Sequence, residues 1–132
     1  MDHVAAQPQP KVFFVPHETH ETQNFWNASR IYARPGGGVA CLSEVPRALA
    51  ARDTRGFIQL IRDRATDRLL GARILAPEGS ELLMAVALAI RHGITVRDIA
   101  GAFHPYLALS DGIKLAALSF GKEVRKLSCC AA

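Results

Sequence analysis

Two adjacent cysteines, Cys129 and Cys130, are the residues of this sequence that point most directly to chemistry. Thiolates are soft ligands, so a neighbouring pair favours soft ions such as Hg(II), Cu(I) or Cd(II) over hard cations. Two thiolates also suit a linear, two-coordinate metal, and a position in the chain tail suits transient capture better than the closed cage of a structural zinc site. The pair therefore predicts a soft-metal site, with a tail that has no function as the alternative.

Cys41, the third cysteine, lies in the short apolar stretch 39–42. Free cysteine in such a stretch packs as a small hydrophobe, so we expect Cys41 to be buried and inert. An odd number of cysteines with two neighbours argues against a secreted disulfide framework and for reduced thiols. We therefore expect a reducing compartment, namely the cytoplasm.

Other metal and nucleotide patterns are incomplete in this sequence. His17 and His20 flank Glu18 and Thr19, a spacing of three, whereas the helical zinc motif His-Glu-x-x-His needs a spacing of four. The glycine run 36–38 lacks the Gly-x-Gly-x-x-Gly spacing and the preceding parallel strand of a dinucleotide cradle. A Cys-x-x-x-x-Cys redox dithiol is also missing. We therefore do not expect this chain by itself to bind a flavin or nicotinamide cofactor.

Tyr106 lies after Pro105 in a segment that we expect to be a loop between two helices. Its phenol can donate or accept a hydrogen bond at a functional site, although a tyrosine packed at an interface is the alternative. His104 and Asp111 flank the same turn. These three residues form a second candidate site.

The elements that must position these residues begin with a β-hairpin. Segments 56–62 and 68–75 are rich in β-forming residues, and the polar connector 63–67 has the length of a hairpin loop. Both faces of segment 57–62 are largely apolar, so we expect this strand to be covered on both sides. An antiparallel sheet is therefore predicted.

Three helices are predicted to follow the hairpin. The first covers residues 80–91, with Ser80 as its N-cap and Gly93 as its stop. It is apolar around nearly its whole circumference, which implies burial between the sheet and another layer or another subunit. The second begins at Thr95, whose spacing to Asp98 resembles a capping box, and the third covers residues 113–120. Ser110 or Asp111 is expected to cap the third, and Gly121 to end it.

The length of 132 residues suits one α+β domain with an antiparallel sheet packed against about three helices. We expect residues 1–38 to be a poorly ordered extension, in which segment 11–15 has the composition of a strand. Residues 39–127 are expected to form the domain, and residues 128–132 the cysteine tail. The net charge of +4 is scattered along the chain, so we expect no nucleic-acid partner. The longest apolar run, 82–90, is about half of what a membrane span needs, so no membrane partner is expected either.

Several segments taken together carry a family resemblance. They read VPRALA at 45–50, DTRGFI at 53–58, APE at 76–78, EL at 81–82, ALAI at 87–90, PYL at 105–107, GIKLAA at 112–117 and LSCCA at 127–131. They strongly resemble the C-terminal dimerisation domain of the mercuric reductases, which are flavin-dependent pyridine nucleotide-disulfide oxidoreductases. The resemblance runs from about residue 41 to residue 132, and residues 1–38 do not share it.

The resemblance implies a homodimer, or pairing with a flavin-containing subunit. It implies that Cys129 and Cys130 bind Hg(II) and pass it to a redox dithiol of the other subunit, with Tyr106 lining that inner site. In most relatives of the superfamily this loop holds a His paired with a downstream Glu, and Tyr106 and Asp111 stand at the corresponding places here. FAD and NADPH belong to the parent enzyme, so this chain alone is not expected to be catalytic. A stand-alone soft-metal-binding protein and an inert remnant are the alternatives.

Overall fold

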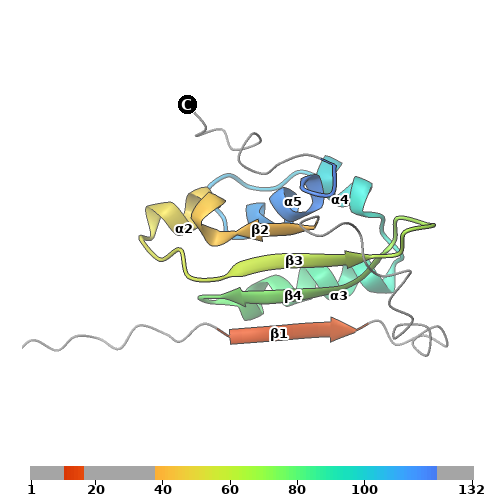
Figure 1. Ribbon diagram of the computed structural model, residues 1–132, viewed down its shortest axis with the longest axis horizontal. Coiled ribbons are helices and arrows are strands. Elements are labelled where there is room, and N and C mark those ends of the chain that lie inside the picture. The colour runs from red at the N-terminus through yellow and green to blue at the C-terminus, as the bar shows by residue number, and fades with distance from the viewer. Residues whose placement is uncertain (1–10, 17–37, 122–132) are drawn as a thin grey trace, which may run out of the picture.

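The computed structural model describes residues 11–16 and 38–121, which form an α+β fold with a four-stranded antiparallel sheet (Figure 1). The strands are β1 (Lys11–Pro16), β2 (Val39–Cys41), β3 (Phe57–Arg62) and β4 (Leu69–Ala76), in the spatial order β1-β4-β3-β2. The helices are α2 (Pro46–Ala50), α3 (Leu83–Arg91), α4 (Val96–Gly101) and α5 (Asp111–Leu118), with 3-10 turns η2 (Leu42–Glu44) and η3 (Gly79–Leu82). The predicted fold class is confirmed.

The central hairpin of β3 and β4 forms where the sequence predicts it. Its loop is held by the side chain of Asp63, which accepts hydrogen bonds from the Thr66 hydroxyl at 2.7 Å and from the Ala65 amide at 3.0 Å. Asp67 then adopts a positive φ of 61° before β4 begins. Aspartate tolerates this conformation better than most residues, which explains why the polar connector closes the hairpin without a glycine.

β1 extends the sheet into the N-terminal segment. It pairs with β4 in an antiparallel register from Lys11 opposite Ala76 to Pro16 opposite Gly71. The sheet therefore includes residues from within the predicted extension, and β1 lies at one edge with β2 at the other. An edge position accommodates Pro16, which has no amide hydrogen to donate.

The core lies between the sheet and the helices. Ile58 and Leu60 of β3 are buried, and their partners across the hairpin, Ile74 and Ala72, have no exposed surface. A Cβ added at Gly112 of α5 would approach Ile58 Cδ1 to 2.6 Å, so the even-numbered face of β3 packs on α5. α3 packs in turn on β4 and β1.

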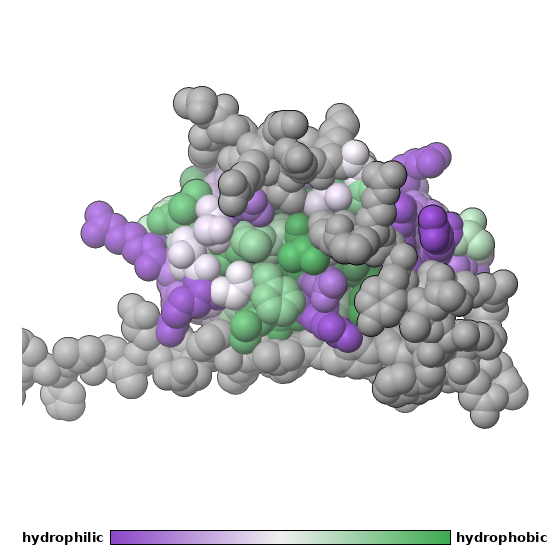
Figure 2. Space-filling model, in the orientation of Figure 1, coloured by the Kyte–Doolittle hydropathy of each residue, from purple (hydrophilic) through white to green (hydrophobic). Residues whose placement is uncertain are grey.

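The opposite face of β3 is only partly covered. Phe57 and Gln59 are half-buried there, whereas Ile61 is 9% exposed. In the orientation of Figure 2, apolar surface gathers over the middle of the molecule, with polar side chains to its left and right. Both faces of β3 were predicted to be covered. The face that packs on the helices is fully covered, whereas the opposite face is covered only in part.

The first long helix begins differently from its prediction. Glu78 adopts a left-handed φ of 55°, the 3-10 turn η3 follows, and α3 begins only at Leu83. Ser80 lies inside that turn and does not cap the helix, so the predicted cap is wrong. The tighter 3-10 turn satisfies the first orphan amides through the backbone, which removes the need for a side-chain cap.

α3 buries one face and exposes the other. Val86, Ala89 and Ile90 are buried, whereas Met84 is 69% exposed and Leu88 is 45% exposed. Within this chain α3 is therefore not covered on all sides. An apolar helix face open to solvent is a common mark of a protein interface.

The predicted C-terminus of α3 and the predicted start of α4 are confirmed. The Gly93 amide donates to Ile90 O at 3.0 Å and the Ile94 amide donates to Ala89 O at 2.9 Å, with Gly93 at a φ of 62°. This is the Schellman arrangement, and it needs a residue that tolerates positive φ. At Thr95 the capping box forms as predicted, because the Asp98 amide donates to Thr95 Oγ1 at 3.1 Å and the Thr95 amide donates to Asp98 Oδ2 at 3.3 Å.

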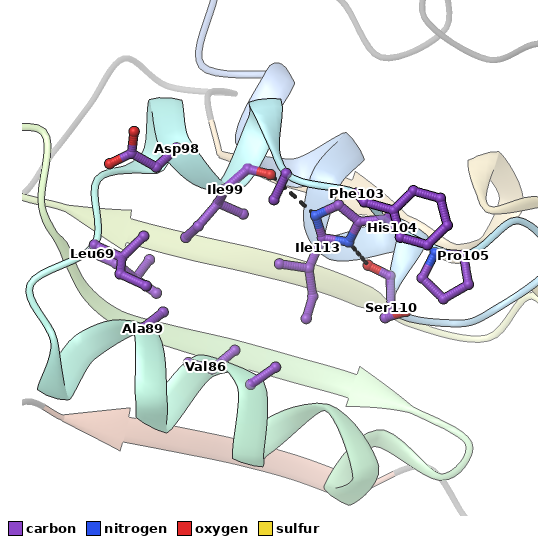
Figure 3. Close-up of a pocket in the computed structure, with 13 residues that line it drawn as sticks. Leu69, Val86, Ala89, Asp98, Ile99, Phe103, His104, Pro105, Ser110 and Ile113 are labelled. Carbon is purple, nitrogen blue, oxygen red and sulfur yellow. Dashed lines mark hydrogen bonds between the residues drawn. The ribbon is translucent and has the colours of Figure 1, made fainter.

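α5 begins at Asp111 with Ser110 as its N-cap residue, although Ser110 makes no capping hydrogen bond through its side chain. The helix ends at Leu118, before the glycine expected to stop it. This position places the loop between α4 and α5 on the side of α3 that carries Val86, where the candidate site lies (Figure 3).

Candidate functional site

The loop between α4 and α5, residues 102–110, presents large side chains to solvent. Phe103 is 91% exposed, Tyr106 is 65% exposed and Leu107 is 44% exposed. Leu107 also has a positive φ of 60°, which a branched aliphatic residue rarely adopts. A residue keeps such a conformation only where the surrounding structure offsets the strain. Residues of this kind cluster at functional sites.

His104 connects the two ends of this loop. Its Nε2 atom lies 3.1 Å from the carbonyl oxygen of Ile99 in α4, and its Nδ1 atom lies 3.2 Å from the carbonyl oxygen of Ser110 before α5 (Figure 3). Both partners are backbone acceptors. The half-buried imidazole therefore bridges the end of one helix and the start of the next.

A mostly apolar pocket of about 430 Å³ lies beneath the loop, between α3, α4, α5 and the start of β4 (Figure 3). Its polar lining residues are Asp98, His104 and Ser110. The remaining lining residues are Leu69, Ala85, Val86, Ala89, Ile94, Ile99, Ala102, Phe103, Pro105 and Ile113. A pocket of this size and lining has the character of a binding site for an apolar group.

Tyr106 and Asp111 lie at the same corner of the fold, as their spacing predicts. Asp111 is the first residue of α5 and is half-buried, whereas Tyr106 is exposed on the loop and does not line the pocket. The two are joined through the short loop that His104 holds. Their roles in a reaction remain a prediction.

Cys41 is exposed, so the expectation of a buried, inert cysteine is wrong. It is the last residue of β2, an edge strand in which neighbouring side chains alternate between the two faces. Ala40 and Leu42 are fully buried on either side of it, which turns Cys41 outward. The apolar stretch was correctly recognised, but its alternation decides which residue is exposed.

The thiol pair Cys129 and Cys130, like His17 and His20, lies outside the described residues. Within residues 11–16 and 38–121, no cluster of three or more histidine, cysteine or acidic side chains is placed to hold a metal ion. The metal site predicted at the two tail cysteines therefore stays a prediction.

Two acidic side chains are held in their ionised form by local donors, and one of them, Asp98, lies at the edge of the pocket. The Thr95 hydroxyl, 2.6 Å from Asp98 Oδ2, lowers the pKa of that carboxyl, and the Thr95 amide adds to the effect. Away from the site, hydrogen bonds from Arg55 lower the pKa of Asp53. Asp98 therefore places a negative charge at the edge of the pocket at neutral pH.

Phe103 and the pocket were not expected from the sequence. A signal did exist: Phe103 directly follows Gly101 and Ala102 and precedes His104 and Pro105, where no helix or strand would bury it. An aromatic side chain in such a position has no local partner. Which groups surround it depends on how α3, α4 and α5 meet.

Comparison with known families identifies the domain. Residues 37–117 match the model of the pyridine nucleotide-disulphide oxidoreductase dimerisation domain. The chain belongs to this family. The resemblance to the C-terminal domain of mercuric reductases is confirmed at the same time, because curated proteins of that name are among its relatives.

These relatives are similar over the same length. The chain is 52% identical over 90 residues to mercuric reductase of Shewanella putrefaciens and 51% identical over 90 residues to that of Shigella flexneri. Each match covers 68% of this chain and 16% of the relative, so the chain spans about a sixth of the length of the reductases it matches.

Two solved structures share the fold. The crystal structure of LpdA from Mycobacterium tuberculosis aligns with a TM-score of 0.66 and 28% identity, covering 82% of this chain and 22% of that protein. The flavoprotein disulfide reductase RclA from Escherichia coli aligns with a TM-score of 0.55 and 19% identity, covering 84% of this chain and 20% of that protein. The second likeness speaks for the fold alone.

The described residues do not fit FAD or NADPH. A dinucleotide cradle needs a parallel strand followed by a glycine-rich turn and a helix, whereas the sheet of this dimerisation domain is antiparallel throughout its described strands.

Among the described residues, no helix is long and apolar enough to cross a membrane.

Proposed function

We propose that this chain is the dimerisation and Hg(II)-relay domain of a mercuric reductase-type enzyme. The observation that carries the proposal is the 52% identity to a mercuric reductase over 90 residues, together with the adjacent thiols Cys129 and Cys130. In this proposal the domain pairs with a second copy or with a flavin-containing subunit. FAD and NADPH are held by other parts of the enzyme and supply the electrons.

The chemistry assigned to this chain is ligand exchange at mercury. Each tail thiol loses its proton to solvent as its sulfur binds Hg(II). For each new Hg–S bond, one of the ligands that Hg(II) carried before leaves the ion. No electron is transferred in this step, and none is transferred when a second dithiol displaces Cys129 and Cys130 in turn. Mercury therefore stays Hg(II) throughout the relay. Soft thiolate ligands favour this ion strongly, and exchange between thiolates is fast when both are accessible.

Tyr106 is the residue of the described loop that we assign to the receiving site. It is 65% exposed on a loop that projects from the domain, so it is available to a partner subunit. Its hydroxyl can donate a hydrogen bond near a metal-bound sulfur or accept one from a neighbouring group. Asp111 lies at the base of this loop and is the second residue assigned to that site.

Hg(II) titration of the reduced full chain tests the proposal. Because Cys41 is exposed and would bind mercury itself, the titration is made in a Cys41→Ser background. We expect one Hg(II) per chain, held in competition with a small dithiol. Changing Cys130 to Ser leaves a single tail thiolate and lowers the affinity by about 100-fold or more, because the second sulfur no longer binds intramolecularly.

The double variant Cys129→Ser, Cys130→Ser supplies the decisive comparison. In the Cys41→Ser background it lacks all three cysteines of the chain, and it should lose tight Hg(II) binding. An unchanged affinity in the double variant would contradict the relay, since mercury would then be bound elsewhere. Tyr106→Phe serves as the matched control, because it leaves every thiol in place and should bind the ion as the parent chain does.

A further inference from the structure

The loop that carries Tyr106 is closed by a single imidazole. His104 lies near the middle of the chain segment between Ile99 and Ser110, and both of its ring nitrogens are within hydrogen-bonding distance of a backbone carbonyl at 3.1 and 3.2 Å. Few side chains can hold two acceptors on opposite sides. Loss of this bridge would remove the side-chain hydrogen bonds that link the end of α4 to the start of α5.

Each of the two carbonyls already accepts one backbone hydrogen bond. Ile99 O accepts from the Ala102 amide at 3.3 Å, and Ser110 O accepts from the Ile113 amide at 3.0 Å. A carbonyl oxygen has two lone pairs, so the imidazole uses the second one in each case. The bridge therefore adds to the helix ends without displacing their own hydrogen bonds.

The number of protons on the ring decides how many of these bonds exist. A neutral imidazole has one N–H and one acceptor nitrogen, whereas the doubly protonated ring has two N–H donors. Carbonyl oxygens can only accept. In the neutral ring one nitrogen lone pair therefore faces a carbonyl lone pair, and only the cationic ring can donate to both.

We propose that His104 is a positioning residue that holds the loop 102–110 closed through two donated hydrogen bonds, and that this closure is complete only when the imidazole is doubly protonated. The relevance to mercury rests on the proposed function, because the loop presents Tyr106. A change of the ring from cationic to neutral then loosens the loop and changes where Tyr106 stands relative to a partner subunit.

The charged groups around His104 are few. Asp98 from α4 is the only other ionisable side chain lining the pocket on the described residues, and α3 and β4 contribute only apolar side chains there. The carboxyl end of α4 favours a positive charge, whereas the amino end of α5 disfavours it and carries Asp111 in its first turn. The two backbone acceptors are therefore the groups that distinguish the protonation states most directly.

Hydrogen–deuterium exchange of the full chain tests the inference. The reporters are the amides of Asp111 and Gly112, which donate to Ala108 O and Leu109 O inside the loop, and the amide of Leu60 in β3, which donates to Gly38 O, is the reference. After correction for intrinsic exchange rates, we expect the reporters to be roughly fivefold better protected at an acidic pH at which spectra of the ring show two protons than at an alkaline pH at which they show one, as the loss of one hydrogen bond implies. The reference amide should not follow this change.

Two variants and one control complete the design. His104→Leu should lose the pH response and show low protection at both pH values, and His104→Asn should keep part of the protection without the pH response. His92→Asn, which removes an exposed histidine at the end of α3, should behave as the parent chain. The same pH response in His104→Leu, or full protection in that variant, would overturn the proposal.

The protonation claim has a direct readout that needs no variant. Nitrogen-15 spectra of the labelled His104 ring should show both nitrogens protonated under the conditions in which the loop amides are protected. A single protonated nitrogen with undiminished protection would refute the two-donor bridge. Because mercury affinity is measured separately at the tail thiols, failure of the bridge and failure of the relay can be told apart.

Discussion

At the scale of single residues, the chain uses short-range hydrogen bonds to fix the elements around the candidate site. Asp98 is the clearest case, since its carboxylate accepts from both the hydroxyl and the amide of Thr95 at the start of α4. At the other end of that helix, His104 Nε2 lies within hydrogen-bonding distance of the Ile99 carbonyl oxygen. Asp98 thus fixes the start of α4, and His104 links the end of α4 to the residue before α5.

The capping by Asp98 predicts a pH dependence of stability. Because the Thr95 hydroxyl lowers the pKa of Asp98 in the folded state, this contribution is present above the ordinary carboxyl pKa and is lost as the pH falls through the lowered folded value. The stability difference between the parent chain and Asp98→Asn, measured by urea unfolding, should shrink between about pH 6 and pH 3. Glu81→Gln, another exposed acid, shows whether loss of any one carboxylate would have the same effect.

At the scale of elements, the fold depends on the close approach of α5 to β3. Gly112 lies in the first turn of α5, and an added Cβ would stand 2.6 Å from Ile58 Cδ1 and 3.1 Å from Val45 Cγ2. Both neighbours are fully buried and cannot move outward. A glycine at this position sets the distance between helix and sheet, and so the position of the loop that precedes the helix.

Two alanine substitutions test this packing. Gly112→Ala should destabilise the domain, because overpacking at a buried contact exceeds the gain in helix propensity. Gly101→Ala is the matched control, since no atom lies within 4 Å of its added Cβ at the end of α4. We expect the free energies of unfolding of the two variants to differ by about 2 kcal/mol. Equal stability would mean that α5 can shift freely on the sheet.

At the scale of the whole molecule, the exposed face of α3 is the surface most in need of a partner. Met84 and Leu88 stand outward from a helix whose other side is buried in the core. Membership of a dimerisation-domain family gives this surface an expected use. Pairing of two copies would cover it and bring the loop with Tyr106 close to the other subunit in the arrangement that we propose.

Sedimentation of paired variants tests the role of this face. Leu88→Lys places a charge on the exposed side of α3 and should shift the full chain towards monomer by about tenfold or more in dissociation constant, because a buried lysine at an interface loses its solvation. Leu49→Lys on α2 is the matched control, because Leu49 is 46% exposed and Leu88 is 45% exposed. Equal behaviour of both variants would assign the dimer contact to another surface.

The sequence determined the parts of this protein that depend on neighbours along the chain. The hairpin of β3 and β4, the Thr95–Asp98 capping box and the stop at Gly93 each involve residues a few positions apart, so their types and spacing suffice to predict them. The family resemblance also lies in short segments that can be recognised without knowledge of the fold. The soft-metal chemistry expected of Cys129 and Cys130 comes from their residue type and adjacency, and the Hg(II) relay comes from the family resemblance.

Only the tertiary structure decided which side chains are exposed and which elements pack against one another. The exposure of Cys41 depends on the pleat of an edge strand. α3 is buried on one side because the sheet covers that side and no other element of the described residues covers the opposite side. The pocket exists because three helices and β4 meet beneath one loop. The two carbonyls that flank His104 belong to Ile99 of α4 and to Ser110 just before α5, 11 positions apart. Such arrangements arise from the packing of distant segments, and no local pattern of residues encodes them.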